Sequence, residues 1–220
     1  MGAGCMIRRI TTSKVVEDAE GKLIAPAAER NRAPILDVLL PKMPRRGDVL
    51  EIASGTGQHI AALAAHRPDL TFHPSDPDPT RRASIDAHCR GLPNVAPAGD
   101  IDAGQPGWAI QDAADMVLVV NLLHLISDGE LSVLLDEASQ ALAPGGLLAI
   151  YGPFLRDGQP TGDADRAFDA NLRAQDPMIG LKDIDVVRTV LNVLELKVEV
   201  VEMPANNLMV LARAGTVAGL

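Results

Sequence analysis

The residues with the clearest chemical potential lie in the stretch "EIASGTGQH", at positions 51–59. An apolar run typical of a buried strand includes the carboxylate Glu51. Gly55 and Gly57 follow it, just before an alanine-rich helical pattern. A bend without Cβ atoms lets a ligand pack against peptide groups, and the N–H groups that open the helix favour electron-rich ligands. We therefore predict a ligand site at this bend.

Two classes of ligand use a Gly-x-Gly bend. A dinucleotide site requires the pattern G-x-G-x-x-G, and this chain has Ile60 where the third glycine belongs. S-adenosylmethionine (SAM) has no pyrophosphate to cradle, and its amino-acid end and ribose can lie over the glycines. The run "VLEIASGTGQH" resembles motif I of the class I SAM-dependent methyltransferases, an acidic residue followed after a short gap by G-x-G. This resemblance favours SAM as the cofactor, with Glu51, Ala53, Gly55 and Gly57 among its contacts.

Carboxylates follow the next two predicted strands. Asp76 lies about 25 residues after Glu51, where it can accept two hydrogen bonds from a ribose diol. Its alternative role is to cap the following helix. Asp100 stands where the methyltransferase pattern holds the adenine amino group, although it can equally be a solvated turn residue. We predict Asp76, Asp100 and the adjacent Ile101 as cofactor contacts.

Two residues beyond the later strands could serve catalysis. Asn121 ends the fourth predicted strand and His124 follows it, in a segment that resembles the meeting point of donor and acceptor in small-molecule methyltransferases. Histidine titrates near neutrality, so His124 could take a proton from an acceptor, or it could simply cap a helix start. Tyr151 reaches the same edge as an acceptor contact or as ordinary packing. We predict Asn121 as a cofactor contact and His124 and Tyr151 as catalytic residues.

The elements that must position these residues alternate in type. From Asp48 onward, short apolar runs alternate with helical patterns, which predicts βαβ units around a parallel sheet that binds ligands at its carboxyl edge. The predicted strands are Val49–Ala53, Leu70–Pro74, Asn94–Ala98, Met116–Val120 and Leu147–Tyr151. The predicted helices are 25–43 (interrupted by Pro34), Gln58–His66, Thr80–Arg90, Gly129–Ala143, 164–175 and Asp183–Leu194. Two strand-like runs around "PANN" predict a closing antiparallel hairpin.

Composition narrows the class of protein. The chain has 220 residues, of which 47% are hydrophobic and 22% charged, with a formal net charge of −9. This acidic balance argues against a nucleic-acid partner, because such binding rests on Lys and Arg neutralising phosphates. No apolar run approaches the ~20 residues of a membrane span. The two cysteines form no C-x-x-C and the start lacks a secretory apolar region, so we expect a soluble cytoplasmic protein. The five histidines show no metal-site spacing.

A more specific resemblance extends along the chain. The segments "PAAERNRAPIL", "HPSD", "YGPF", "FDANLRAQDP" and "MPANNLMVL", together with motif I, resemble the methyltransferase-like protein 26 family, also catalogued as domain-of-unknown-function family 938. The resemblance covers roughly residues 25–212. It implies an α/β, Rossmann-like class I methyltransferase fold: a mostly parallel seven-stranded sheet that ends in an antiparallel hairpin, with helices on both faces. We expect a flexible N-terminal extension at 1–24 and the methyltransferase domain at 25–220.

The resemblance also suggests further contacts and one departure. Arg30 and Asn31 open the first helix and could reach the methionine carboxylate, unless they only form an exposed helix face. Asn206 and Asn207 either approach the site or serve the hairpin turn. After "QDP", where an aromatic residue, a glycine and an Arg-Asp pair are expected, the chain reads Met178 to Asp183 as "MIGLKD".

The predicted function is methyl transfer from SAM to a small-molecule O, N or S acceptor. A methyltransferase acting on RNA or protein would use the same donor motifs, but the fourth strand lacks the Pro-Pro-aromatic ending of many nucleic-acid amino methylases. A protein that binds SAM without turnover and, least favoured, a nicotinamide oxidoreductase stay open as alternatives. The chain could act as a monomer or a homodimer.

Overall fold

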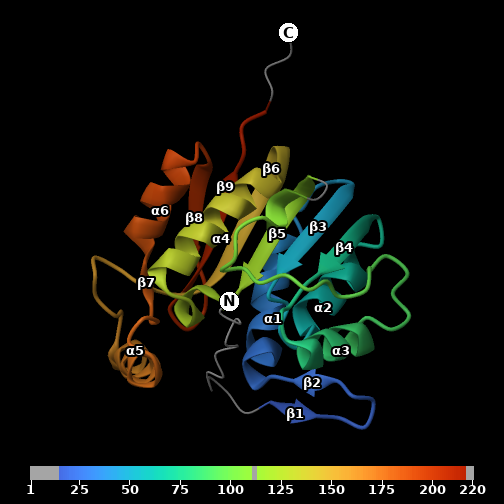
Figure 1. Cartoon of the computed structure of the whole chain (residues 1–220), viewed down its shortest axis with the longest axis horizontal. Helices are drawn as coiled ribbons and strands as arrows, with labels where there is room; N and C mark the ends of the chain where they lie inside the picture. Colours follow the sequence, from blue (N-terminus) through green and yellow to red (C-terminus); the bar gives the residue numbers. More distant parts are fainter. Residues whose placement is uncertain (1–14, 111–112, 217–220) are drawn as a thin grey trace, which may run out of the picture.

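A computed structural model describes residues 15–110 and 113–216 of the chain, and within these residues the main sheet has seven strands. Strands β4, β3, β5, β6, β9 and β8 follow one another across the sheet, and β7 pairs with β6 (Figure 1). The pairs of β3 with β4 and β5, and of β6 with β5 and β7, are parallel. The β6–β9 and β9–β8 pairs are antiparallel. The predicted mostly parallel sheet with a closing antiparallel hairpin is therefore confirmed.

The predicted bounds of β4 are confirmed, whereas β3, β5 and β6 begin or end up to five residues away from the predicted positions. Those of the main sheet are β3 (Gly47–Ile52), β4 (Leu70–Pro74), β5 (Ala114–Val120), β6 (Leu142–Leu155), β7 (Lys182–Asp183), β8 (Lys197–Glu202) and β9 (Asn207–Arg213). A separate antiparallel pair, β1 (Val16–Glu17) and β2 (Leu23–Ile24), falls within the predicted N-terminal extension. Residues 1–14 of that extension lie outside the described residues.

Helices cover both faces of the sheet because the central strands are apolar on both sides. Along β5, Met116 and Leu118 join one buried cluster, while Val117 and Val119 join the other, as the alternation of side chains in a strand requires. The first cluster includes α1 (Pro26–Leu39), α2 (Gln58–His66) and α3 (Pro79–His88). The second includes α4 (Asp128–Ala141) and α6 (Ile184–Val193). The helix α5 (Asp163–Gln175) buries only Leu172 and stands apart (Figure 1).

Two predicted elements differ from the structure for reasons that involve proline. The segment Asn94–Ala98 forms no continuous strand; it makes one isolated parallel bridge, Phe72 with Val95, and Gly99 just after it makes another with Ser75. Pro97 has no N–H to donate to a ladder, which accounts for the interruption. Conversely, α1 continues through Pro34, although the proline cannot donate to the carbonyl of Arg30.

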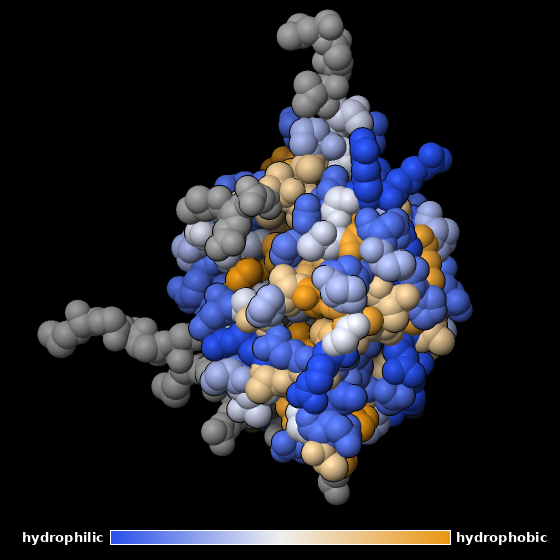
Figure 2. Space-filling view, turned by 90° about the vertical axis from the view of Figure 1, so that its right-hand side faces the viewer, coloured by the Kyte–Doolittle hydropathy of each residue, from blue (hydrophilic) through white to orange (hydrophobic). Residues whose placement is uncertain are grey.

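The surface is largely polar on the side that carries α3 and β4. Figure 2 shows this face, on which apolar side chains lie scattered among hydrophilic ones. Among the described residues, no helix combines the length and apolar character needed to cross a bilayer.

Candidate active site

The bend after β3 is held in shape by hydrogen bonds to β4. Its backbone is left-handed at Ala53, Gly55 and Gly57, with φ values of 55°, 60° and 91°. Ser54 N–H donates to the carbonyl of Ser75 at 2.7 Å, and the Ser54 hydroxyl accepts from Ser75 N–H at 3.1 Å. Gly57 N–H closes the bend on the Ser54 carbonyl at 3.0 Å. The loop is thus a rigid extension of the two neighbouring strands.

The two glycines of the bend serve different purposes. A Cβ atom on Gly57 would lie 2.7 Å from the Cα of Ile85, so this glycine allows α3 to pack closely. A Cβ on Gly55 would meet no protein atom nearer than the Ala53 carbonyl oxygen at 3.9 Å. Gly55 instead borders a cavity, so its missing side chain leaves room for a ligand.

This cavity, which we call the turn cavity, has a volume of about 280 Å³. Its walls come from the segment around β1 and β2, the start of α1, the end of β3 with the bend that follows it, the first turns of α2 and α3, and the end of β5 with the segment after it. They include Val15, Leu23, Ala25, Ala27, Ala28, Glu51, Ala53, Ser54, Gly55, Thr56, His59, Arg81, Val120, Asn121, Leu122 and Leu125.

Side-chain bonds hold the N-terminal segments against the bend. Leu23 N–H donates to the Ser84 hydroxyl at 2.8 Å, and that hydroxyl donates to the Thr56 carbonyl at 2.8 Å. The Gln58 side chain accepts from Ala25 N–H at 2.8 Å. These bonds explain how residues of the predicted extension come to line the cavity.

Glu51 is a buried acid with an unused oxygen on the wall of the turn cavity. Its residue is 1% exposed, and within the described part of the chain no donor reaches its Oε2. Burial raises the pKa of Glu51 to about 7; an opposing hydrogen bond from Ser54 lowers it and the nearby Asp76 charge raises it further. An unsatisfied buried carboxylate oxygen is costly, so this site calls for a hydrogen-bond donor or a cation from a ligand.

Asp76 and Asp100, which were also predicted to contact the nucleoside, lie outside the wall of the turn cavity. Asp76 is buried, and its carboxylate accepts from the N–H groups of Gly55 and Asp78, each at 3.0 Å, so it braces the bend from behind. The cap of α3 is Asp78, which accepts from Thr80 N–H. The Asp100 side chain is 69% exposed and lies 3.3 Å from Arg82. Neither Asp76 nor Asp100 is on the turn-cavity wall.

Ile101 lines a different cavity, of about 300 Å³, together with His73 and Trp108. The structure therefore does not bring Ile101 together with the bend after β3.

A second and larger space, which we call the rim cavity, has a volume of about 680 Å³. It shares Ala27 and Asn121 with the turn cavity. Its walls also include Arg30, Asn31, Pro34, His124, Tyr151, Pro153, Ala164, Asp165, Phe168, Pro204, Ala205 and Asn207. The structure thus brings both predicted catalytic residues together with Arg30 and Asn31, at the carboxyl ends of β5 and β6.

Asn121 stands between the two cavities in an uncommon conformation. Its φ is 57°, and its N–H donates to the Tyr151 carbonyl at 2.8 Å, which ties the end of β5 to β6. Asparagine tolerates this left-handed backbone better than most residues. No side chain or backbone group of the described residues bonds its carboxamide, which is therefore available to a ligand in either cavity.

His124 belongs to the short 3₁₀ helix η2 (Leu123–Leu125) and is 5% exposed. Its ring lies edge-on to Phe168 of α5, with centroids 5.3 Å apart. Burial lowers the pKa of His124 to about 4, and the charge of Lys182 lowers it further. At neutral pH the imidazole is therefore uncharged and can accept a hydrogen bond.

The segment 178–183, which departs from the pattern of the resembled family, is hydrogen-bonded to the backbone of His124. Gly180 N–H donates to the His124 carbonyl at 3.2 Å, and the Lys182 ammonium donates to Asp128 at 2.8 Å. Ile179 and Leu181 are buried in the protein interior. None of these four residues lines the rim cavity.

The side chain of Asn31 connects residues on the walls of the two cavities. His59, 8% exposed on the turn-cavity wall, has Nε2 2.8 Å from Oδ1 of Asn31. Burial, with a contribution from Arg32, lowers the pKa of His59 to about 4, so the neutral ring donates from Nε2 to the amide oxygen. Burial raises the pKa of Tyr151, and a hydrogen bond from Asn31 opposes that rise. Asn31 thus links His59 with Tyr151 on the rim-cavity wall.

Sequence reasoning missed His59, although it ends the motif on which the cofactor prediction rests. Its position in the first turn of the helix after Gly-x-Gly was the available signal. The bond to Asn31 joins residues 28 positions apart, and no sequence signal indicated it.

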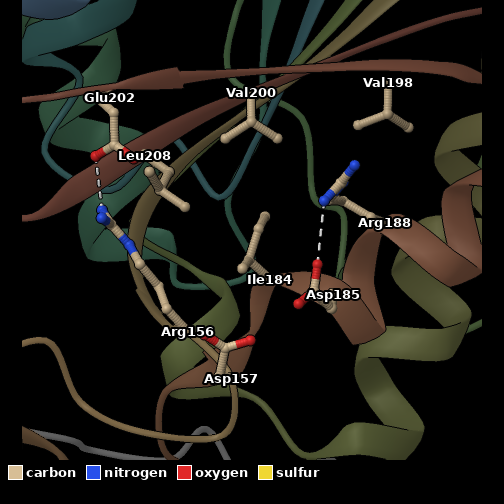
Figure 3. Close-up of a pocket in the computed structure, with 9 residues that line it drawn as sticks. All are labelled: Arg156, Asp157, Ile184, Asp185, Arg188, Val198, Val200, Glu202 and Leu208. Atoms are coloured by element: carbon tan, nitrogen blue, oxygen red, sulfur yellow. Dashed lines mark hydrogen bonds and ion pairs between the residues drawn. The ribbon is translucent and has the colours of Figure 1, made fainter.

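The β8–β9 turn forms another part of the rim-cavity wall. Asn207 lines the cavity, but its side-chain amide donates to the carbonyls of Pro204 and Ala205 and so holds the turn. Asn206 adopts a φ of 60° and is a turn residue. Arg156 fixes this turn by pairing with Glu202 at 2.8 Å (Figure 3).

A further cavity, of about 370 Å³, lies behind that pair, between α6 and β8 (Figure 3). Its second arginine, Arg188, is paired with Asp185 at 3.1 Å. Both arginines of this cavity are already neutralised by acids, and it shares no residue with the turn or rim cavity.

In the described part of the chain, no group of three or more His, Cys, Asp or Glu side chains is arranged to hold a metal ion.

Comparison with known proteins gives one family and a consistent fold. The sequence profile of the family described as "Protein of unknown function (DUF938)" matches residues 22–213. Among solved structures, an O-methyltransferase family protein from Burkholderia thailandensis is 19% identical, with a TM-score of 0.75 over 87% of this chain and 58% of that protein. Human N-acetylserotonin methyltransferase, in complex with SAM, is 17% identical, with a TM-score of 0.72 over 86% and 53%.

A putative O-methyltransferase from Nostoc punctiforme is 18% identical, with a TM-score of 0.72 over 84% of this chain and 56% of that protein. The chain thus spans little more than half the length of these three proteins. Likeness at such identities concerns the fold, and it shows that the chain has the predicted α/β, Rossmann-like fold of methyltransferases.

Proposed function

The chain belongs to the DUF938 family, and we propose that it is a SAM-dependent methyltransferase that acts on a small-molecule O, N or S acceptor. The turn cavity would hold the cofactor and the rim cavity the acceptor. We also propose that the chain belongs with the methyltransferase-like protein 26 group and that it acts in the cytoplasm. The O-methyltransferases that share the fold support the proposed reaction class.

One observation supports SAM above all: the orphaned Glu51 oxygen and the bare Gly55 border the same cavity. SAM has an ammonium group that can satisfy a buried carboxylate, and its bulk requires the space that a Cβ on Gly55 would take. The residues present therefore fit the cofactor. Glu51 would hold its charged end, and Gly55, Ala53 and Asn121 would contact it.

We assign Asp76 a supporting role in this proposal. Its carboxylate fixes the N–H of Gly55 and so sets the shape of the bend. Asp100 and Ile101 contribute nothing to the turn-cavity wall, and Arg30 and Asn31 belong to the rim cavity.

When bound, SAM supplies a methyl group activated by a positively charged sulfur, and an acceptor atom takes this group with its own electron pair. The protein has to align the acceptor and exclude water; alignment alone can contribute roughly 7–11 kcal/mol in the best cases. Asn121 lines both cavities and would orient the acceptor beside the cofactor.

The proton of a hydroxyl acceptor would pass to His124. A neutral imidazole with a pKa of about 4 is a weak base towards an alcohol, but it suffices once the new C–O bond has made that proton strongly acidic. Tyr151, whose pKa is raised by burial, stays protonated and can donate a hydrogen bond to the acceptor.

The experiment that tests the activity is a screen of hydroxyl, amine and thiol acceptors with SAM, read out as release of S-adenosylhomocysteine. Release that depends on one small-molecule class supports the proposal. Release only with RNA or protein would replace it with a macromolecular methyltransferase. Tight binding of SAM with no release for any acceptor would point to a non-catalytic binding protein.

A further inference from the structure

Arg30 carries the next inference, which rests on the proposed function. It lies on the rim-cavity wall and is exposed, and among the described residues no acid pairs with it. Its neighbour on α1, Arg32, is by contrast held by Glu29 at 3.2 Å. A chain with a net charge of −9 thus leaves a free guanidinium beside a large cavity.

The charges around the rim cavity lie on different elements. Among the described residues that line it, Asp165 of α5 is the one acid; its carboxylate accepts the hydroxyl of Thr161 and pairs with no described cation, so it keeps its charge, whereas Arg30 lies on α1. His124 is neutral at physiological pH because burial lowers its pKa to about 4. The side of the cavity formed by α1 is therefore a site for an anion.

The rest of the wall is suited to a flat ring. Phe168 and Tyr151 contribute aromatic surfaces, and three prolines contribute rigid apolar ones: Pro34, Pro153 and Pro204. A volume of about 680 Å³ lies within the range of roughly 300–1,000 Å³ found for small-molecule sites.

We propose that the methyl acceptor is a small aromatic hydroxy acid, bound with its carboxylate on Arg30 and its ring against these apolar surfaces. A guanidinium and a carboxylate can form two parallel charge-assisted hydrogen bonds, which fix orientation as well as adding affinity. The hydroxyl then approaches Asn121 and His124. Arg30 is a specificity-determining residue for the acceptor and has no part in holding SAM, because it is absent from the turn-cavity wall.

The test uses two probes of the same shape, the anionic 4-hydroxybenzoate and the neutral 4-hydroxybenzamide, titrated into the full chain saturated with S-adenosylhomocysteine. The wild type should bind the acid about 10-fold more tightly or better, as expected of a hydrogen bond to a charged group. Arg30→Gln should remove this preference and leave the affinity for S-adenosylhomocysteine unchanged. Arg166→Gln, an exposed arginine of α5 outside both cavities, should keep the preference.

The outcomes separate this inference from the proposed function. If S-adenosylhomocysteine does not bind, the proposed function fails and the inference fails with it. If it binds but the two probes bind equally or not at all, only the inference is overturned. A loss of S-adenosylhomocysteine affinity in Arg30→Gln alone would assign the guanidinium to the cofactor and also overturn it.

Discussion

The amide oxygen of Asn31 lies 2.8 Å from Nε2 of His59, so a side chain on the rim-cavity wall is hydrogen-bonded to one on the turn-cavity wall. This bond joins α1 to the first turn of α2. Asn31 therefore helps to hold both the proposed acceptor site and the proposed cofactor site, and its substitution should affect both.

Asn31→Ala should destabilise the protein by about 1–3 kcal/mol, because it leaves the buried His59 N–H without an acceptor. Urea unfolding monitored by circular dichroism measures this. Asn31→Asp restores an acceptor and should raise the pKa of His59, which NMR titration of the ring can follow. An unchanged unfolding midpoint in Asn31→Ala would show that this bond does not matter to the fold.

Replacing His124 should slow turnover without weakening cofactor binding. His124→Phe keeps a flat ring against Phe168 but cannot accept a proton, so we expect a loss of about 10²–10⁴-fold in kcat. The exposed His66 offers a matched control, and His66→Ala should be silent. Full activity of His124→Phe would remove the catalytic role and leave His124 as packing.

The buried histidines should make stability depend on pH. The folded pKa values of His59 and His124 are about 4, below the ordinary 6.5, so the unfolded state binds more protons between these values. Their contribution is fully present above pH 6.5 and is lost as the pH falls towards 4, by up to about 3 kcal/mol each. Unfolding free energies measured across this range should depend less on pH in His124→Phe than in the wild type.

Glu51 should act in the opposite direction and should also govern cofactor affinity. Its folded pKa of about 7 lies above the ordinary 4.5, so its contribution to stability is lost as the pH rises from 4.5 to 7. Since a cationic ligand favours the charged carboxylate, SAM affinity should increase as the pH rises through about 7. Calorimetry at a series of pH values measures this; Glu51→Gln should bind weakly and with no such dependence.

Much of the fold was predictable because local signals agreed with one another. Hydrophobic alternation and the Gly-x-Gly bend predicted the end of β3 and the bounds of α2, which the structure places at Gln58–His66 as expected. Proline chemistry caused both kinds of error. Pro97 interrupts a predicted strand at the edge of the sheet, and Pro34 is accommodated within α1 without ending it.

The candidate site was less predictable because its geometry depends on contacts between distant residues. A carboxylate after β4 suggests a ribose contact, yet whether Asp76 faces the cavity depends on the bond it makes to Gly55, 21 residues earlier. Likewise, the β1–β2 pair reaches the turn cavity through Ser84, 61 residues away from Leu23. No local pattern carries such information.

The most direct test of the account compares two glycines that both have a left-handed backbone. Gly55 and Gly91 both have positive φ values, 60° and 87°, and neither would clash with the protein on gaining a Cβ, but only Gly55 borders the turn cavity. Isothermal titration with SAM should give tight binding to the wild type and to Gly91→Val, and weak or no binding to a folded Gly55→Val. Equal affinity in both variants, or no binding of SAM to the wild type, would contradict the central claim.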